Sequence, residues 1–294
     1  MQLAEMFPDE ESARVWIENV IWPDGRVCPR CKGSNTYEAT HKKLPYRCRP
    51  CKRHFSVRKG TLLENSKLPY RKWVYAIYLE KTSLKGISSM KLHRDLGVSQ
   101  PTAWFMLQRI REVFGSDQPF QFNGPVEVDE AYFGGLEKNK HARKKANLGR
   151  GPVAKTAVVG MKDRESNKVA ARVVASTGKS TLQGFVKEHV RDDTKIYTDD
   201  ARAYIGLENH ESVKHSVSEY VNGQAHTNGV ESFWAVLKRA YHGVYHHISP
   251  KHLQCYVDQF AGKHNIRGLD TIDQMAYIVR QMVGKQLLYK DLIA

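Results

Sequence analysis

Three acidic motifs hold the residues of this chain that are best suited to chemistry. Asp129 follows the run VEV, Asp199 follows the run KIYT, and Glu231 lies within HTNGVESFWAVLKR. That last segment has the spacing of an amphipathic helix, and the face beside its apolar stripe carries Glu231, Lys238 and, close by, Asn228. Carboxylates that meet in a fold repel one another unless a cation lies between them. Oxygen ligands of this kind suit magnesium or manganese.

Such ions support a defined class of reaction. Two divalent cations held roughly 3.5–4 Å apart can activate a water or a sugar hydroxyl for attack on a phosphodiester, and they stabilise the oxygen that leaves. We therefore expect Asp129, Asp199 and Glu231 to be magnesium or manganese ligands. Glu130, the neighbour of Asp129, is expected to point to the opposite face of its strand and to support the site.

The cysteines predict a second metal. Cys28 and Cys31 form one C-x2-C pair, and Cys48 and Cys51 form another after sixteen intervening residues. This spacing is typical of a tetrathiolate zinc site in a small zinc ribbon. Two disulfides or a redox pair are the alternatives, which a cytosolic setting and the duplication of the motif disfavour. Cys255 lies in a helical pattern and is interpreted as an ordinary buried thiol.

The segment around the cysteines is too small to fold by burial alone, so the metal would supply folding free energy. It is also basic, which favours contact with DNA over a purely structural role. The bases that support this interpretation are Lys42, Lys43, Arg47, Arg49, Lys52 and Arg53.

A helix-turn-helix is expected after the ribbon. ISSMKLHRDLGVSQPTAWFMLQRIREVF contains a helix, a Gly-Val-Ser turn and a second helix that begins after Ser99. In the functional interpretation, Gln100 and Thr102 face base edges while Arg109 and Arg111 approach phosphates. An ordinary helical hairpin is the alternative.

From about residue 119 the pattern alternates between strands and helices. We expect three strands, a helix, a strand, a helix formed by ARAYIGLE, a fifth strand and a long helix, which is the order of a ribonuclease-H-like mixed sheet with helices on both faces. Asp129 would end the first strand, Asp199 would end the fourth, and Glu231 would come from the helix after the fifth. Adjacent strand ends are where ligands collect in such sheets.

Overall charge points to a polyanionic partner. The chain of 294 residues has a formal net charge of +15, which favours nucleic acid. A basic stretch is expected to be a loop that orders on DNA. It contains Lys138, Lys140, Arg143, Lys144, Lys145 and Arg150. The sequence has no apolar run of about 18 residues and its first residues are acidic, so neither a membrane span nor export is expected. We expect a cytoplasmic protein associated with the nucleoid.

Together these motifs resemble the insertion-sequence transposases of the ISXO-like branch, which join a zinc ribbon to a DDE catalytic domain. The resemblance runs from about residue 20 to 265 in the order of the family. It rests on YRCRPCKRHFSVRKGTLLENSKLPYRKW, VEVDEAYFGG with KNKHARKKANLGRG, IYTDDARAY and HTNGVESFWAVLKRAYHGVYHHISPKHLQCYVDQFAGKHN.

The resemblance places the catalytic aspartates of the family at Asp129 and Asp199, and its helix motif at Asn228, Glu231 and Lys238. Members carry Asn or Glu as the third ligand, so Asn228 and Glu231 both remain candidates. The carboxylate is the better ligand because it adds negative charge against the dication. Lys238 is expected to contact DNA phosphate near the scissile bond, or else to be a solvated lysine paired with Glu231 or a neighbour.

The implied function is a DNA transposase with structural zinc and catalytic magnesium or manganese. It would bind the terminal inverted repeats of its element, hydrolyse a phosphodiester to free a 3′ hydroxyl, and join that hydroxyl to target DNA as a homodimer or larger oligomer. The expected organisation is a helical segment (1–22), the zinc ribbon (23–60), the helix-turn-helix (61–118), the catalytic domain (119–265) and a helical tail (266–294).

Two other functions remain open on the sequence. A non-catalytic zinc-ribbon and helix-turn-helix regulator, derived from a transposase or an inactive copy of one, would keep DNA binding and lose the chemistry. A cellular nuclease of the same fold would cut DNA without regard to specific ends.

Overall fold

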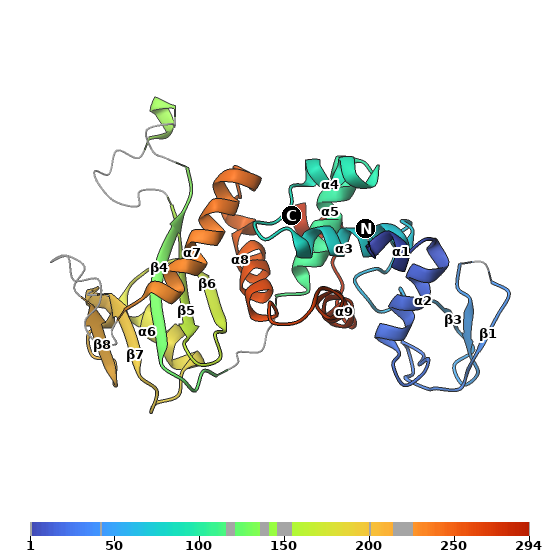
Figure 1. The fold of residues 1–294 in the computed structure, drawn as a ribbon, viewed down its shortest axis with the longest axis horizontal. Coiled ribbons are helices and arrows are strands. Elements are labelled where there is room, and N and C mark those ends of the chain that lie inside the picture. Colours follow the sequence, from blue (N-terminus) through green and yellow to red (C-terminus); the bar gives the residue numbers. More distant parts are fainter. Residues whose placement is uncertain are drawn as a thin grey trace. The chain divides into compact units, whose positions relative to one another are not determined.

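The chain forms two compact units in the computed structural model (Figure 1). The first unit comprises Met1–Phe114 and Arg267–Ala294, and the second comprises Gly115–Ile266. The structure describes residues 2–41, 43–115, 121–135, 141–145, 155–199, 201–213 and 226–293. Among these residues, no helix combines the length and the apolar character that a membrane crossing requires.

The first unit begins with α1 (Gln2–Met6) and α2 (Glu10–Ile21), followed by a small antiparallel sheet of β1 (Thr36–Glu38), β2 (Tyr46–Cys48) and β3 (His54–Phe55). Tyr46 fastens α2 to this sheet. Its hydroxyl donates to Glu18 Oε2 at 2.7 Å and accepts from Arg14 Nη1 at 2.5 Å. The sheet therefore gains packing from a helix that the cysteine motif does not include.

Helices make up the remainder of the first unit. They are α3 (Tyr70–Thr82), α4 (Ser89–Leu96), α5 (Gln100–Glu112), α9 (Thr271–Gln281) and α10 (Tyr289–Ile293). The expected turn is present: Gly97 ends α4 in the left-handed conformation at φ 58°, and Ser99 Oγ caps α5 by accepting from Thr102 N at 3.3 Å. One face of α5, which includes Met106, Leu107 and Ile110, is buried.

The second unit is built on a five-stranded mixed sheet. Its strands are β4 (Val126–Phe133), β5 (Thr156–Asp163), β6 (Val169–Val174), β7 (Ile196–Asp199) and β8 (His210–Val213), in the spatial order β6-β5-β4-β7-β8. β4 is antiparallel to β5 and parallel to β7, and β7 is parallel to β8. Its helices are α6 (Lys179–His189), α7 (Asn228–Ala240), which continues into a π-helical turn at Tyr241–Tyr245, and α8 (Pro250–Asn265).

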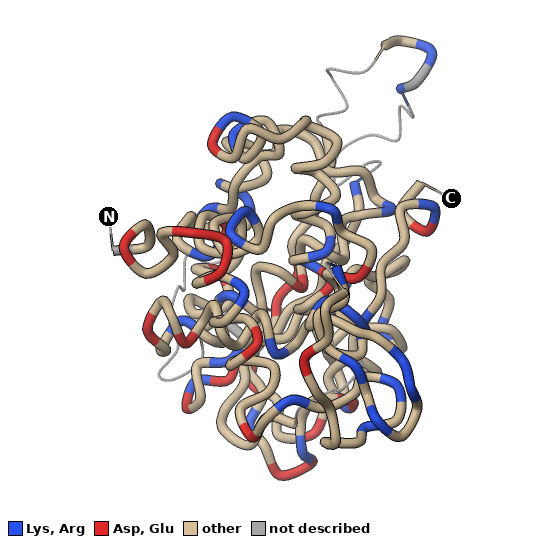
Figure 2. The backbone as a smooth tube through the Cα atoms, turned by 90° about the vertical axis from the view of Figure 1, so that its right-hand side faces the viewer, with Lys and Arg blue, Asp and Glu red and all other residues tan. Residues whose placement is uncertain are grey.

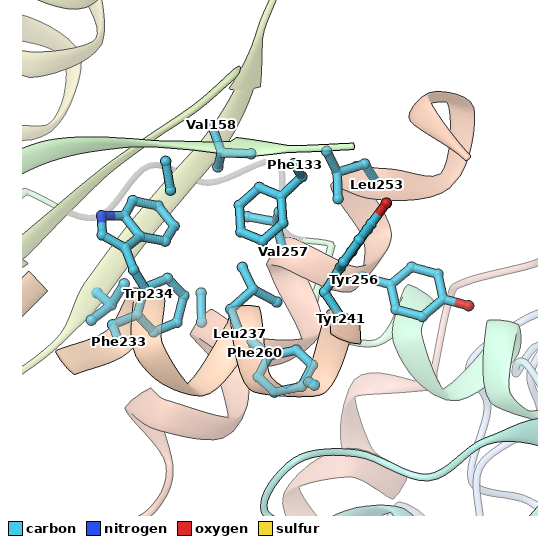
Figure 3. Packing of buried hydrophobic residues seen from close by; sticks show 14 of the residues in the cluster. Phe133, Val158, Phe233, Trp234, Leu237, Tyr241, Leu253, Tyr256, Val257 and Phe260 are labelled. Atoms are coloured by element: carbon cyan, nitrogen blue, oxygen red, sulfur yellow. The ribbon is translucent and has the colours of Figure 1, made fainter. Parts of the chain in front are cut away.

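Apolar side chains cover both faces of this sheet, as the alternation of strands and helices predicts. On one face, Val126, Val128 and Val159 pack with Phe185 and Val186 of α6. The other face holds the larger cluster with α7 and α8, in which Trp234 and Leu237 lie near Phe133 and Val158 (Figure 3). The predicted mixed α/β sheet with helices on both faces is thus confirmed.

Two details of the expected secondary structure are wrong. β4 does not end at Asp129 but continues to Phe133, because Ala131 and Phe133 supply further apolar side chains to the α7 face. The segment ARAYIGLE forms only a short 3-10 helix, η3 (Arg202–Tyr204), whose Tyr204 is fully buried.

Gly160 lets α7 approach the sheet closely. A Cβ atom at this position would lie 2.5 Å from Cζ2 of the buried Trp234. We expect Gly160→Ala to lower the free energy of unfolding by about 1–3 kcal/mol, because overpacking a core displaces side chains or backbone. Urea unfolding of the purified protein measures this loss.

Gly184 provides the matched control for that substitution. It lies exposed in α6, and a Cβ there meets nothing within 4 Å. Gly184→Ala should raise stability by up to about 1 kcal/mol because alanine is the better helix former. Equal effects at both glycines would contradict the close approach of Trp234.

Candidate functional site

An acidic cluster lies where β4 and β7 run side by side. Carboxylate oxygens of Asp129, Glu130 and Asp199 all fall within 4.8 Å of one another. Asp129 and Glu130 come from the middle of β4, and Asp199 is the last residue of β7. Three oxygen ligands at this separation fit a magnesium or manganese ion.

Glu130 is a member of this cluster that sequence reasoning assigned only a supporting role. Strand alternation does place it on the side of η3, where the Tyr204 hydroxyl donates to its carboxylate. Its oxygen nevertheless reaches the same 4.8 Å group, because β7 ends at Asp199 beside it. The signal for this role in the sequence is that Glu130 directly follows Asp129 in VEVDE.

The acidic cluster is electrostatically strained without a cation. Burial raises the pKa of Asp129 to about 6, with further increases from the charges of Asp199 and Glu231, while Lys238 acts in the opposite direction. Burial also raises the pKa of Glu130 to about 7, and Asp199 and Asp129 add to this increase. A divalent ion would relieve this repulsion by binding the ionised carboxylates.

These shifts predict how stability depends on pH. Both folded pKa values exceed those of unfolded Asp and Glu, near 4, so the two groups contribute most below about pH 4 and that contribution is lost as the pH rises through about 6 to 7. Zinc-loaded protein without other divalent ions should therefore lose unfolding free energy between pH 5 and pH 8. Saturating Mn²⁺ should oppose the loss.

The control for this prediction is the Asp129→Asn, Glu130→Gln double variant, measured by urea unfolding at both pH values. Its stability should fall less between pH 5 and pH 8 than that of the wild type. The same pH dependence in both proteins would show that the acidic cluster is not its source.

Helix α7 carries the third motif. Glu231 and Lys238 are exposed on one face, and Glu231 Oε1 accepts from the buried Thr227 hydroxyl at 2.9 Å. Glu231 is outside the 4.8 Å group, although its charge acts on Asp129. Asn228 is the first residue of α7 and is also exposed. Both candidates for the third ligand thus lie on exposed positions of the helix that packs beside β4.

Sulfur atoms of the four predicted cysteines converge in the first unit. Cys28 Sγ lies 3.6 Å from Cys51 Sγ, and Cys31 Sγ lies 3.5 Å from Cys48 Sγ. Tetrahedral zinc with Zn–S bonds of about 2.3 Å needs sulfur separations of roughly 3.8 Å, so the four thiolates fit a structural zinc ion. Each CxxC turn ends at a lysine with positive φ, Lys32 at 59° and Lys52 at 57°, so the two turns are built alike.

Positive charge is concentrated around this cysteine site. Residues 23–60 contain eleven Lys and Arg against two acids, a net charge of +9 out of the +15 of the chain. Several of these side chains are exposed, and the Lys and Arg positions can be followed in blue along the backbone in Figure 2. The exposed bases are Arg30, Lys32, Lys43, Arg49, Lys52, Arg53 and Lys59.

The prediction that Arg109 and Arg111 approach DNA phosphates is wrong. Their exposed fractions are 7% and 1%, and the Arg109 guanidinium stacks 4.4 Å above the ring of Phe105. The C-terminal segment covers this side of α5: Lys285 Nζ donates to Glu112 O at 2.9 Å, and the Tyr289 ring packs on Phe105. The helical spacing of apolar residues predicts one buried face of α5, but it does not reveal this second face, which the C-terminal segment covers.

Gln100 and Thr102 lie at the start of α5, as expected, and are half-buried. Gln100 Nε2 donates to Ser89 Oγ at 2.8 Å, and the Thr102 hydroxyl lies 2.8 Å from Ser99 Oγ. Their contact with bases stays a prediction.

Of the predicted basic loop, Arg143 is exposed within the single 3-10 turn η2 (Ala142–Lys144), and Lys145 follows it half-buried. The backbone of Lys144 belongs to that turn. Lys138, Lys140 and Arg150 lie outside the described residues.

Comparison with known proteins places the acidic cluster and the cysteine site in two different domain families. Residues 121–265 match the family of the ISXO2-like transposase domain, and residues 8–54 match the transposase zinc-ribbon domain. A protein of Halobacterium salinarum described as an uncharacterized protein in transposable element ISH50 is 28% identical over 255 residues, which cover 81% of this chain and 85% of that protein. The first match contains the acidic cluster and the second contains the four cysteines, so the chain belongs to the DDE insertion-sequence transposases that carry a zinc ribbon.

Proposed function

We propose that this transposase binds the terminal inverted repeats of its element and catalyses metal-dependent hydrolysis and strand transfer into target DNA. The observation that carries the proposal is the group of Asp129, Glu130 and Asp199 oxygens within 4.8 Å, inside the matched transposase domain. A regulator that only binds DNA has no need for such a group.

The proposal includes a ribonuclease-H-like catalytic domain. In its support, an antiparallel β6-β5-β4 sheet is extended by the parallel strands β7 and β8, and helices cover both faces. Parallel pairing of β4 with β7 brings Asp129 and Asp199 to the same region, although neither is near the other in sequence.

In this proposal, Asp129 and Asp199 hold the catalytic ions with Glu130, Glu231 or Asn228 as additional ligands. When bound, magnesium or manganese would activate the attacking oxygen and stabilise the leaving oxygen. In the first step, water attacks phosphorus, the bond to the 3′ oxygen of the element breaks, and that oxygen takes a proton. In the second, the 3′ hydroxyl attacks a target phosphodiester and releases a target 3′ hydroxyl, while Lys238 contacts a phosphate beside the scissile bond.

Recognition of the repeats is assigned to the first unit, and the basic stretch around Arg143 in the second unit adds phosphate contacts. The exposed bases of residues 23–60 would contact the backbone, and Gln100 and Thr102 at the start of α5 would contact base edges in a helix-turn-helix. Arg143 and Lys145, with Lys138, Lys140, Lys144 and Arg150, would add salt-dependent phosphate contacts. Two ends must be joined together, so at least a homodimer on double-stranded DNA is expected, at the nucleoid.

Duplex oligonucleotides that carry the repeats flanking this gene test the proposal. Purified protein with Mg²⁺ or Mn²⁺ should free a 3′ hydroxyl at the repeat end and join it to a plasmid, while a duplex with a scrambled repeat should remain uncut. Cleavage of both duplexes alike would favour a nuclease. Binding to the repeats without cleavage in either metal would favour the regulator.

Substitutions on α7 distinguish the candidates for the third ligand. If Glu231 is that ligand, Glu231→Gln should lower strand cleavage by about 10²-fold or more while Asn228→Ala has a smaller effect, because loss of a charged ligand removes several kcal/mol of stabilisation. The reverse order would assign the role to Asn228. The same end-cleavage assay gives both rates.

A further inference from the structure

Glu127 is a buried carboxylate that the proposed chemistry does not use. It lies on β4 two residues before Asp129, and its side chain is 2% exposed. An ionised group with so little exposure requires compensating partners. Arg164 supplies one: its Nε donates to Glu127 Oε1 at 2.8 Å.

The first turn of α7 supplies the second partner. The backbone N–H of Val230, one of the amides that a helix start leaves without an internal acceptor, donates to Glu127 Oε2 at 2.9 Å. Negative charge at this end of a helix is favourable. The side chain of Thr227, the residue at the N-cap position, makes no capping hydrogen bond. The carboxylate of Glu127 on β4 takes that role instead.

Gly229 makes this approach possible. A Cβ atom at this position would lie 2.6 Å from Glu127 Oε2 and 3.1 Å from its Cδ. The same residue is held from β5, since Lys162 Nζ lies 3.4 Å from the Gly229 carbonyl oxygen, which accepts the bond. The start of α7 is therefore fixed against two strands at once.

Arg164 connects a third element. Its Nη2 donates to the His226 carbonyl at 2.7 Å, and its guanidinium lies 4.1 Å above the ring of Tyr197 on β7. Glu127 and Tyr197 are themselves partners in the register of β4 and β7. One guanidinium thus touches β4, β7 and the segment that enters α7.

Each of these contacts lies two residues before a proposed ligand. Glu127 precedes Asp129, Tyr197 precedes Asp199, and His226 precedes Asn228 by that interval. In a strand, residues two apart are consecutive side chains on one face. A shift of the ion pair would therefore reach Asp129 on β4 and Asp199 on β7 through the next side chain on the same face, and the start of α7 through the bond from Arg164 to the His226 carbonyl.

We propose that Glu127 and Arg164 form a positioning pair that sets the spacing of β4, β7 and α7 and so arranges the oxygen ligands of the acidic cluster. This inference rests on the proposed function, because it concerns the metal ligands assigned there. Neither residue touches the reacting atoms. Their effect is expected on metal affinity and on the rate that depends on it.

Arg164→Lys is the first test. Lysine keeps a positive charge beside Glu127 but lacks the planar fork that reaches the His226 carbonyl and stacks on Tyr197. Mn²⁺ binding to the DNA-free, zinc-loaded full chain, followed by electron paramagnetic resonance, should weaken by roughly ten- to hundredfold, the usual effect of losing a group that orients a ligand. Binding to the repeat duplex should stay within about twofold, because neither Arg164 nor Glu127 is among the residues proposed to contact DNA.

Gly229→Ala is the second test, and it leaves every charge of the pair in place. The added methyl group must displace the Glu127 carboxylate, which should weaken Mn²⁺ binding to a similar extent and speed hydrogen exchange of the Val230 amide. Gly184→Ala, with open space around its Cβ, is the matched control and should leave both properties unchanged.

The results of these experiments distinguish failure of the positioning role from failure of the proposed metal site. If wild-type protein binds Mn²⁺ in a manner abolished by Asp129→Asn, and folded Arg164→Lys and Gly229→Ala bind it within about twofold of wild type, the positioning role is overturned while the proposed function stands. If wild-type protein shows no Asp129-dependent Mn²⁺ binding, the proposed metal site is contradicted and the positioning role falls with it. A lower melting temperature with unchanged Mn²⁺ affinity would show a purely structural pair.

Discussion

Cys48→Ser should release the zinc ion and unfold the segment around the cysteines. Cys48 is fully buried, and among the described residues its apolar cluster contains Cys28, Tyr46 and Phe55, with Trp22 and Cys51 packed at its edge. A core of this size cannot offset the chain entropy of 38 residues, residues 23–60. Structural zinc contributes about 10–16 kcal/mol in comparable small domains, so its loss is the largest stability effect expected in this chain.

The measurement for this prediction is zinc content by mass spectrometry together with binding to the repeat duplex. The variant should hold almost no zinc, and binding should weaken by at least about tenfold at moderate salt, because the exposed bases of residues 23–60 lose their arrangement. Cys255→Ser is the control, since a serine hydroxyl can keep the bond of Cys255 Sγ to the His252 carbonyl oxygen. Full zinc content in Cys48→Ser would contradict the tetrathiolate site.

Asp129→Asn and Asp199→Asn should each abolish strand cleavage while DNA binding is retained. Asparagine keeps the shape of the side chain but removes the charge that holds a divalent cation. Such a cation is worth several kcal/mol in the transition state, and each 1.36 kcal/mol is a factor of ten, so we expect losses of roughly 10³-fold or more. Single-turnover cleavage of the repeat duplex measures the rate.

The matched control for these variants is Glu208→Gln, which removes an exposed carboxylate of the same unit. It should cleave at the wild-type rate, and all three variants should bind the repeat duplex as tightly as wild type. Cleavage by Asp129→Asn within about tenfold of wild type would exclude this aspartate as a metal ligand.

Features with local signals could be predicted from the sequence. The spacing of the four cysteines indicated their convergence, and Ser99 before an apolar helical stripe gave the start of α5. The polar run KDRESNK between two apolar runs is the local signal of the β5-β6 hairpin, residues 156–174. In each case the determining residues lie within a few positions of one another, so pattern alone carries the information.

Features that depend on distant partners could not be predicted. Arg109 and Arg111 are buried because a segment more than 170 residues later covers α5, as the bond from Lys285 to Glu112 shows. Glu130 joins the acidic cluster because of where the parallel strand β7 ends. The Glu127–Arg164 pair depends on the register of β4 with β7 and on the position of α7, none of which leaves a periodic signal.

Anomalous diffraction from a crystal of the zinc-loaded protein with Mn²⁺ and an uncleaved repeat duplex tests the central claim most directly. Recorded at the manganese edge, it should show density between the carboxylates of Asp129 and Asp199, with the scissile phosphate against the same ions. Manganese confined to other acidic side chains, with none bound between Asp129 and Asp199, would contradict the account of this domain as a metal-dependent DNA strand-transfer enzyme.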